Sequence, residues 1–113
     1  MEIRTKTTQG ATVLELKGKL IGNTDANTFR MSLREQLSKN VSKVVIDLEE
    51  LEWLNSSGLG LLVEAAIKMR QAAGDIKLAR ANERVKNIFA ITKLEQMFEI
   101  FSTVDDAIAA FDK

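Results

Sequence analysis

The amino-acid sequence predicts an α/β fold in which a mixed central sheet of four or five strands is flanked by about four helices. After two opening strand-like segments, short apolar runs alternate with longer segments of helical periodicity, as in parallel sheets whose strands are joined by helices. The run at residues 43–48 (KVVIDL) is apolar with little alternation, which is typical of a strand covered on both faces. We therefore expect a sheet that is largely parallel after its first strands.

The opening elements are two strands and a helix. Residues 2–8 and 11–18 are predicted strands around the turn signal Gln9-Gly10, and the second is expected to end at Gly18. The segment after residue 20 has apolar residues at intervals of four, which predicts an amphipathic helix. Asn23 or Thr24 is expected to cap this helix.

The middle elements follow the same alternation. After the strand at 43–48 and a connector at 49–54, residues 57–73 are predicted to form a helix. Its expected apolar face is Leu59, Leu62, Val63, Ala66, Ile67 and Met69. Trp53, the only tryptophan, is expected to pack at the edge of the core.

The closing elements are two strands and two helices. Residues 76–79 and 97–101 are the predicted strands, and Asn82 or Glu83 is expected to open the helix between them. Ser102 and Thr103 each precede an aspartate by three residues, the spacing of a capping box, so we expect a last helix to begin there.

Length and composition fit a single domain over residues 1–113. The chain is 45% hydrophobic and 28% charged, and a chain of this size can bury a core without a disulfide or a metal. Its 16 lysine and arginine residues balance 16 aspartate and glutamate residues. A net charge of zero gives no electrostatic attraction to nucleic acid or to an anionic membrane. We expect a monomer that neither binds nucleic acid directly nor inserts into a membrane, since no apolar run approaches transmembrane length.

The missing residue types exclude several kinds of chemistry. The chain has no cysteine and no histidine, so it lacks thiolate chemistry, the commonest general base and the commonest metal ligand. Neither a phosphate-binding loop nor a nucleophile-elbow motif is present. We expect no catalytic residue, metal or cofactor. The absence of cysteine and of a signal peptide favours a cytoplasmic location.

The segment N-S-S-G-L-G, residues 55–60, carries the strongest functional signal. Asn55 can cap the predicted helix, which would place Ser56 and Ser57 in its first turn with their hydroxyls free to face solvent. The amide-rich start of a helix suits an anion. Each glycine weakens a helix interior by about 1 kcal/mol relative to alanine. Gly58 and Gly60 therefore indicate that another backbone comes close, either within the fold or from a bound partner.

These residues resemble the signature of the STAS domain found in bacterial anti-sigma-factor antagonists. The resemblance is carried by residues 44–62 (VVIDLEELEWLNSSGLGLL), by the GKL turn at 18–20 and by residues 74–111. It implies a STAS-like sandwich and partner switching. The unmodified domain would bind an anti-sigma factor that is also a serine kinase, and so release a sigma factor. The kinase would phosphorylate Ser56, or alternatively Ser57, to dissociate the complex, and a serine phosphatase would reset the switch.

The resemblance also implies a surface for the partner and two departures from the family pattern. The expected contact residues are Ile21, Asn23, Asn55, Ser56, Ser57, Gly58, Leu59 and Gly60. Asn55 and Ile21 stand where the family usually has aspartate. They leave open a second reading as an unphosphorylated scaffold, such as an accessory subunit of a membrane transporter or of a stress-sensing complex. A small enzyme or nucleotide binder using the helix start at 55–58 is a third.

Overall fold

The computed structural model describes residues 1–112, and its elements follow the predicted alternation. Their bounds are β1 Glu2–Thr8, β2 Ala11–Leu20, α1 Gly22–Ser38, β3 Lys43–Leu54, α2 Ser56–Gln71, β4 Asp75–Ala79, α3 Glu83–Thr92, the 3₁₀ turn η1 Leu94–Gln96, β5 Ile100–Phe101 and α4 Val104–Ala110.

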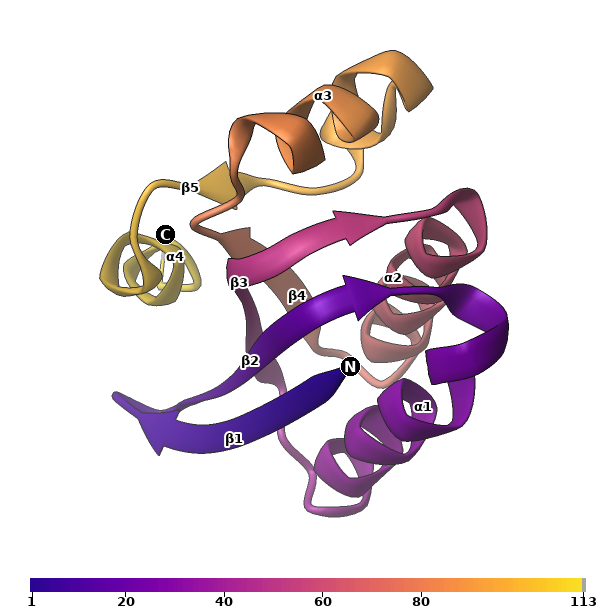
Figure 1. Cartoon of the computed structure of the whole chain (residues 1–113). Coiled ribbons are helices and arrows are strands. Elements are labelled where there is room, and N and C mark those ends of the chain that lie inside the picture. Colours follow the sequence, from indigo (N-terminus) through magenta and orange to yellow (C-terminus); the bar gives the residue numbers. More distant parts are fainter. Residues whose placement is uncertain (113) are drawn as a thin grey trace.

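The five strands form one sheet in the order β1-β2-β3-β4-β5 (Figure 1). β1 and β2 are an antiparallel hairpin, and each later strand pairs in parallel with the one before it. Each connection between parallel strands contains a helix. Such a connection has to carry the chain from the end of one strand back to the level where the next strand begins. The predicted mixed sheet with about four helices is confirmed.

The sheet separates a large core from a small one. Because side chains alternate along a strand, Val44 and Ile46 of β3 face the large core while Val45 faces the small one. Figure 1 shows α1 and α2 together on one side of the sheet and the short α4 on the other. The small core consists of Ala11, Val13, Val45, Ala79, Ala107 and Ile108. Since α4 is only seven residues long, it covers part of its face of the sheet.

Several turn and cap predictions are confirmed. Gln9 and Gly10 both adopt left-handed backbone angles, with φ of 52° and 79°, as a tight hairpin turn requires. The side chains of Asn82 and Thr103 each accept a hydrogen bond from the backbone N–H three residues later, at 2.8 and 3.0 Å. These two bonds fix where α3 and α4 begin.

The predicted cap of α1 was wrong. Neither Asn23 nor Thr24 caps the helix, which begins at Gly22 directly after Ile21 and has no side-chain cap. Instead the buried Asp25 carboxylate reaches back and accepts the Ile21 N–H at 2.8 Å. The Asp25 carboxylate, in the first turn of α1, thus satisfies the backbone N–H of Ile21, the residue just before the helix.

β2 extends beyond its predicted end. Gly18 does not terminate the strand, because its φ of 101° lets the backbone bulge and continue to Leu20. The pairing with β3 shifts register between Glu15 and Lys17 and again between Gly18 and Lys19. Such bulges bend a strand without ending it.

β3 is twice as long as predicted. The sequence indicated a strand at 43–48 and a connector at 49–54, but the connector is strand as well. Leu48, Leu51 and Leu54 all point into the large core. Their spacing of three is possible because of the bulges in the pairing with β2, and it hides the usual strand period of two. β4 ends opposite Asp47, so the second half of β3 pairs with β2 alone.

Two further predictions needed correction. The strand predicted at 97–101 is reduced to Ile100–Phe101, because residues 94–96 form η1 and Phe98 turns into the core against Phe89 at a ring distance of 5.7 Å. On α2, Ile67 is 45% exposed. Leu61 and Ala65 are buried in its place, since α2 packs sideways against α1 as well as on the sheet.

Candidate functional site

The site forms where β2 and β3 end side by side and α1 and α2 begin. Asn55 holds these ends together. Its Oδ1 accepts the Gly58 N–H at 2.7 Å, which caps α2, and the Gly22 N–H at 3.3 Å, at the first residue of α1. The backbone N–H of Asn55 donates to the Leu20 carbonyl oxygen at 3.3 Å. One asparagine side chain therefore sets the relative position of two helix N-termini, and the prediction that Asn55 caps α2 is confirmed.

The glycines of the motif have different surroundings. A Cβ added to Gly58 would lie 2.0 Å from the Leu20 carbonyl oxygen, and one added to Gly22 would lie 2.2 Å from the Ser57 Cβ. Both positions therefore require glycine, because another segment of the fold lies too close to leave room for a side chain. Around Gly60 no atom lies within 4 Å of an added Cβ. Of the two motif glycines, only Gly60 leaves open the space that a partner's backbone could use.

Both serines are exposed in the first turn of α2. Ser56 is the first residue of the helix, and Ser57 follows with its Cβ packed toward Gly22. The first amides of a helix have no partner inside it. Gly58 donates its N–H to Asn55, whereas the amides of Ser56 and Ser57 have no hydrogen-bond acceptor within residues 1–112.

The electrostatics of α2 favour an anion at this end. Its first turn contains no acidic residue, while its last turn contains Lys68 and Arg70. The partial positive charge of the helix N-terminus is therefore not offset by a carboxylate on the same helix, and the basic residues stabilise its other end.

The structure separates the predicted contact residues by accessibility. Asn23 and Gly60 are exposed like the serines, and Ile21 and Asn55 are partly buried. Gly58 is buried, and Leu59 is only 4% exposed as part of the large core. In this conformation Gly58 and Leu59 shape the site but offer no side-chain surface to a partner.

A partly buried ion pair that the sequence did not reveal lies where β3 passes the end of β4. Asp47 is 2% exposed and accepts hydrogen bonds from Arg80 Nε at 3.0 Å, from Arg80 Nη2 and from the Glu49 N–H at 3.1 Å. Arg80 also contacts the Glu49 carboxylate. The hydrogen bond to Asp47 raises the pKa of the Arg80 guanidinium. The pair ties the start of the β3 extension, which leads to Asn55, to the end of β4. An aspartate within an apolar strand was the only sequence signal for it.

The described part of the chain contains neither a metal-binding cluster nor a helix that could span a membrane. No group of three carboxylate, histidine or cysteine side chains there is arranged to hold a metal ion. None of the helices formed by residues 1–112 is both long and apolar enough to cross a membrane.

Comparisons with known proteins match this architecture. The family model of the STAS domain matches residues 2–107. The anti-sigma-F factor antagonist RsfB of Mycobacterium tuberculosis is 30% identical over 99 residues, which cover 88% of this chain and 80% of RsfB.

Two solved structures share the fold. The crystal structure of a Thermotoga maritima protein described as an anti-sigma factor antagonist superposes with a TM-score of 0.89 at 21% identity, covering 98% of this chain and 95% of that one. The Bacillus cell fate determinant SpoIIAA in its phosphorylated form gives a TM-score of 0.73 at 19% identity, covering 97% and 99%. At these identities the structures establish the fold, while the family model and RsfB establish the relationship in sequence. The chain belongs to the STAS domain family, in the group of the anti-sigma factor antagonists.

Proposed function

We propose that this chain is a partner switch controlled by phosphorylation of Ser56. Unphosphorylated, it binds an anti-sigma factor that is also a serine kinase, and a sigma factor is released. Phosphorylation of Ser56 by that kinase ends the complex, and a serine phosphatase restores it. The chain itself is the regulator and not the enzyme, and it acts in the cytoplasm with the sigma factor.

The observation that carries the proposal is the exposed Ser56 at the first position of α2, where the amides of Ser56 and Ser57 have no acceptor among residues 1–112. Phosphate adds about −1.5 to −2 charges at neutral pH. A helix N-terminus accommodates such a group with its free N–H donors and its dipole. The modification would therefore need no rearrangement of the fold, and its effect would fall on the partner as added charge and bulk at the contact surface.

Ser56 is favoured over Ser57 by the packing of the site. The Ser57 Cβ and carbonyl group lie against Gly22, so this residue is confined between the two helix starts. Ser56 is the first residue of α2 and is exposed to solvent. A kinase must enclose the hydroxyl that it modifies, which is easier at the less confined position.

Two relatives support the proposal. RsfB is named as an antagonist of an anti-sigma factor, and SpoIIAA, which has the same fold, is known in a phosphorylated form. Asn55 departs from the usual aspartate, but its oxygen already makes the hydrogen bonds that a carboxylate would make there. The departure therefore removes one charge next to the acceptor and leaves the local structure in place.

The direct test is phosphorylation in vitro. The wild-type chain is incubated with ATP and, in turn, with each serine-kinase anti-sigma factor of its source genome, and is then examined by intact mass and peptide mapping. We expect one kinase to add a single phosphate to the wild type and to Ser57→Ala but none to Ser56→Ala. Phosphate that persists in Ser56→Ala and disappears in Ser57→Ala would move the switch by one residue. No phosphate with any kinase would contradict the proposal.

A binding measurement tests the second half of the switch. In calorimetric titrations with the kinase that modifies the chain, in the presence of ADP, we expect Ser56→Glu to bind at least tenfold more weakly than Ser56→Ala. Equal affinities of the two variants would contradict control of binding by charge at this position.

A further inference from the structure

Trp53 is more exposed than the sequence indicated, and it lies close to the site. It was expected at the edge of the core, but it is 36% exposed. It stands two residues before Asn55 on the extension of β3, and its partner in the β2 register is Lys19. The next pair along the two strands, Leu20 and Leu54, is fully buried.

The strand geometry assigns Trp53 and Lys19 to one face of the sheet. Because neighbouring residues of a strand point to opposite faces, the burial of the Leu20–Leu54 pair in the large core turns the Lys19–Trp53 pair to the other face. Ile21 follows in an extended conformation, with φ −108° and ψ 112°, so it projects from the same side as Lys19. We name Lys19, Ile21 and Trp53 the Trp53 surface.

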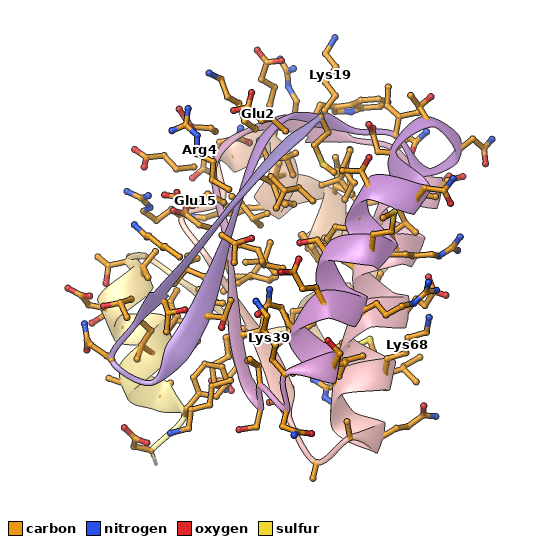
Figure 2. The ribbon with its side chains drawn as sticks, turned by 90° about the horizontal axis from the view of Figure 1, so that it is seen from below. Glu2, Arg4, Glu15, Lys19, Lys39 and Lys68 are labelled. Carbon is orange, nitrogen blue, oxygen red and sulfur yellow. The ribbon has the colours of Figure 1, made fainter. Side chains whose placement is uncertain are left out.

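Within residues 1–112, neither Trp53 nor Ile21 belongs to the large or the small core. α4 packs on this face of the sheet, but the strand residues of its small core are Ala11, Val13, Val45 and Ala79, with Phe101 packed against them. Figure 2 shows Lys19 at the end of the sheet opposite to Lys39, away from α4. Lys19 is exposed and takes part in no ion pair within residues 1–112.

The residue types of this surface are ones that favour protein–protein contact. A tryptophan offers a large apolar area with few rotatable bonds, and tryptophans are enriched among the residues that dominate binding energy. Here Trp53 is the register partner of an exposed lysine, and the half-buried Ile21 follows that lysine by two residues. The surface is continuous with the exposed serines, since the Asn55 N–H donates to the Leu20 carbonyl between them.

We infer that Lys19 and Trp53 extend the contact region for the kinase-type anti-sigma factor beyond Ile21. Trp53 enters an apolar recess of that protein, and Lys19 pairs with a carboxylate at the rim of the recess. This inference rests on the proposed function. It extends the contact area from the start of α2 around the edge of the sheet and gives the partner a contact that phosphorylation of Ser56 does not touch.

Because Trp53 is the only tryptophan, its fluorescence reports on this region. The probe is each serine-kinase anti-sigma factor of the source genome, made without tryptophan and loaded with ADP. We expect complex formation to shift the Trp53 emission to shorter wavelength and to reduce its quenching by acrylamide at least twofold. An emission and a quenching constant that stay unchanged in a complex detected by calorimetry would overturn the inference.

Variants measure how much the contact contributes. We expect Trp53→Ala to weaken binding at least tenfold, Trp53→Phe less, and Lys19→Glu several-fold in a manner that high salt reduces. The matched controls are Ile91→Ala, which alters an apolar side chain that is 81% exposed on α3, and Lys39→Glu, which lies at the far end of α1. Circular dichroism and thermal unfolding confirm that each variant folds, and Trp53→Phe serves if Trp53→Ala does not.

The outcomes separate this inference from the proposed function. If Ser56→Glu weakens binding while both Trp53 variants bind within twofold of the wild type, the inference fails and the switch stands. If the controls weaken binding as much as the Trp53 and Lys19 variants, the inference also fails. If none of the anti-sigma factors binds the wild-type chain and none phosphorylates it, both fail.

Discussion

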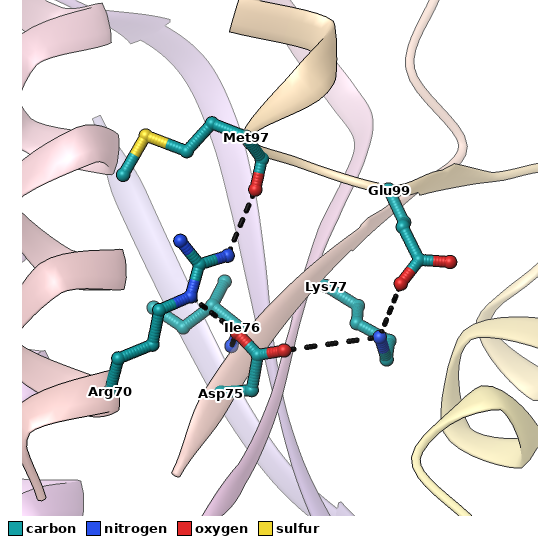
Figure 3. A network of polar contacts seen from close by, with 6 residues as sticks. All are labelled: Arg70, Asp75, Ile76, Lys77, Met97 and Glu99. Carbon is teal, nitrogen blue, oxygen red and sulfur yellow. Dashed lines mark hydrogen bonds and ion pairs between the residues drawn. The ribbon is translucent and has the colours of Figure 1, made fainter. Parts of the chain in front are cut away.

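The two ends of α2 are held in the structure by different kinds of contact. At the N-terminal end the contacts are neutral and involve the backbone: Gly58 lies against the Leu20 carbonyl, and Asn55 joins the two helix starts. At the C-terminal end Gly74 also lies close to the backbone of Ser42, but the side-chain contacts there are charged. Arg70 Nε lies 3.1 Å from Asp75 Oδ1, and Figure 3 shows this pair continuing through Lys77 to the neighbouring segment.

This difference shows how the fold keeps one helix end available. Charged side chains around the start of α2 would compete with an anion, and long side chains would cover the serines. Backbone contacts and a neutral cap hold that end without doing either. The largest effects of mutation are therefore expected at the neutral end, where contacts are closest, and the smallest where charged groups meet solvent.

Gly58→Ala is expected to have the largest effect. The added Cβ would meet the Leu20 carbonyl oxygen at 2.0 Å, and such overpacking costs about 3 kcal/mol. Gly60→Ala is the matched control, because its Cβ meets no atom within 4 Å and should stabilise the helix by roughly 0.5–1 kcal/mol. Urea unfolding of both variants measures the difference. Equal stabilities would show that the helix start is not packed as described.

Asn55→Ala is expected to come second. It removes the acceptor for the N–H groups of Gly58 and Gly22, and the loss of such a cap costs about 1–2 kcal/mol. Asn55→Asp keeps the acceptor and adds a favourable charge at the helix start, so it should be at least as stable as the wild type. Thermal unfolding distinguishes the two. An Asp variant as unstable as the Ala variant would contradict the bridging role.

Much of this neutral end could be predicted from the sequence, because local chemistry determines it. Asn55 is a preferred cap residue followed by a helical pattern, so the helix start and the first-turn serines could be placed. The roles of the glycines could not be separated, since Gly58 and Gly60 differ only in what the fold brings near them. Gly22 gave no signal at all, because its neighbour Ser57 is 35 residues away in the chain.

The features that escaped prediction depend on pairing between distant segments. The β3 extension has buried leucines at a spacing of three. This spacing does not match a strand pattern, and only the bulged pairing with β2 accounts for it. Leu59 was correctly predicted on the apolar face of α2, but its burial conflicts with its second predicted role as a partner contact, and the motif did not indicate that Trp53 is exposed. The Asp47–Arg80 pair joins the middle of β3 to the residue that follows β4, and neither residue identifies the other in sequence.

At the charged end of α2, Lys77→Met is expected to change stability by less than about 1 kcal/mol. The lysine is 6% exposed, with Nζ 2.8 Å from Glu99 Oε1 and 5.2 Å from the centre of the Phe111 ring. Its removal ends the burial of a charge and leaves Glu99 in water, while methionine retains the packing. A loss as large as that of Gly58→Ala would show that the two ends do not differ as proposed. Urea unfolding at neutral pH makes the comparison.

The smallest effect is expected from pH at the middle of α2. A hydrogen bond from Arg30, at 2.9 Å, lowers the pKa of Glu64 below its usual 4.5. The ionised form is thus favoured in the folded state, so its contribution is complete above pH 4.5 and is lost as the pH falls through the lowered value. Since the pair is exposed, we expect at most about 0.5 kcal/mol. Arg30→Gln should reduce this part of the acid dependence in unfolding experiments between pH 3 and 6, while Lys68, which also lowers the Glu64 pKa, retains the rest.

The central claim is that Ser56 is the phosphorylation site of a partner switch. It is tested most directly on the protein isolated from its native cells. Intact mass followed by peptide mapping should give two forms that differ by one phosphate, with the phosphate on Ser56 and with proportions that change between growth and stress. A single unmodified mass under every condition, or phosphate only at another residue, would contradict the account.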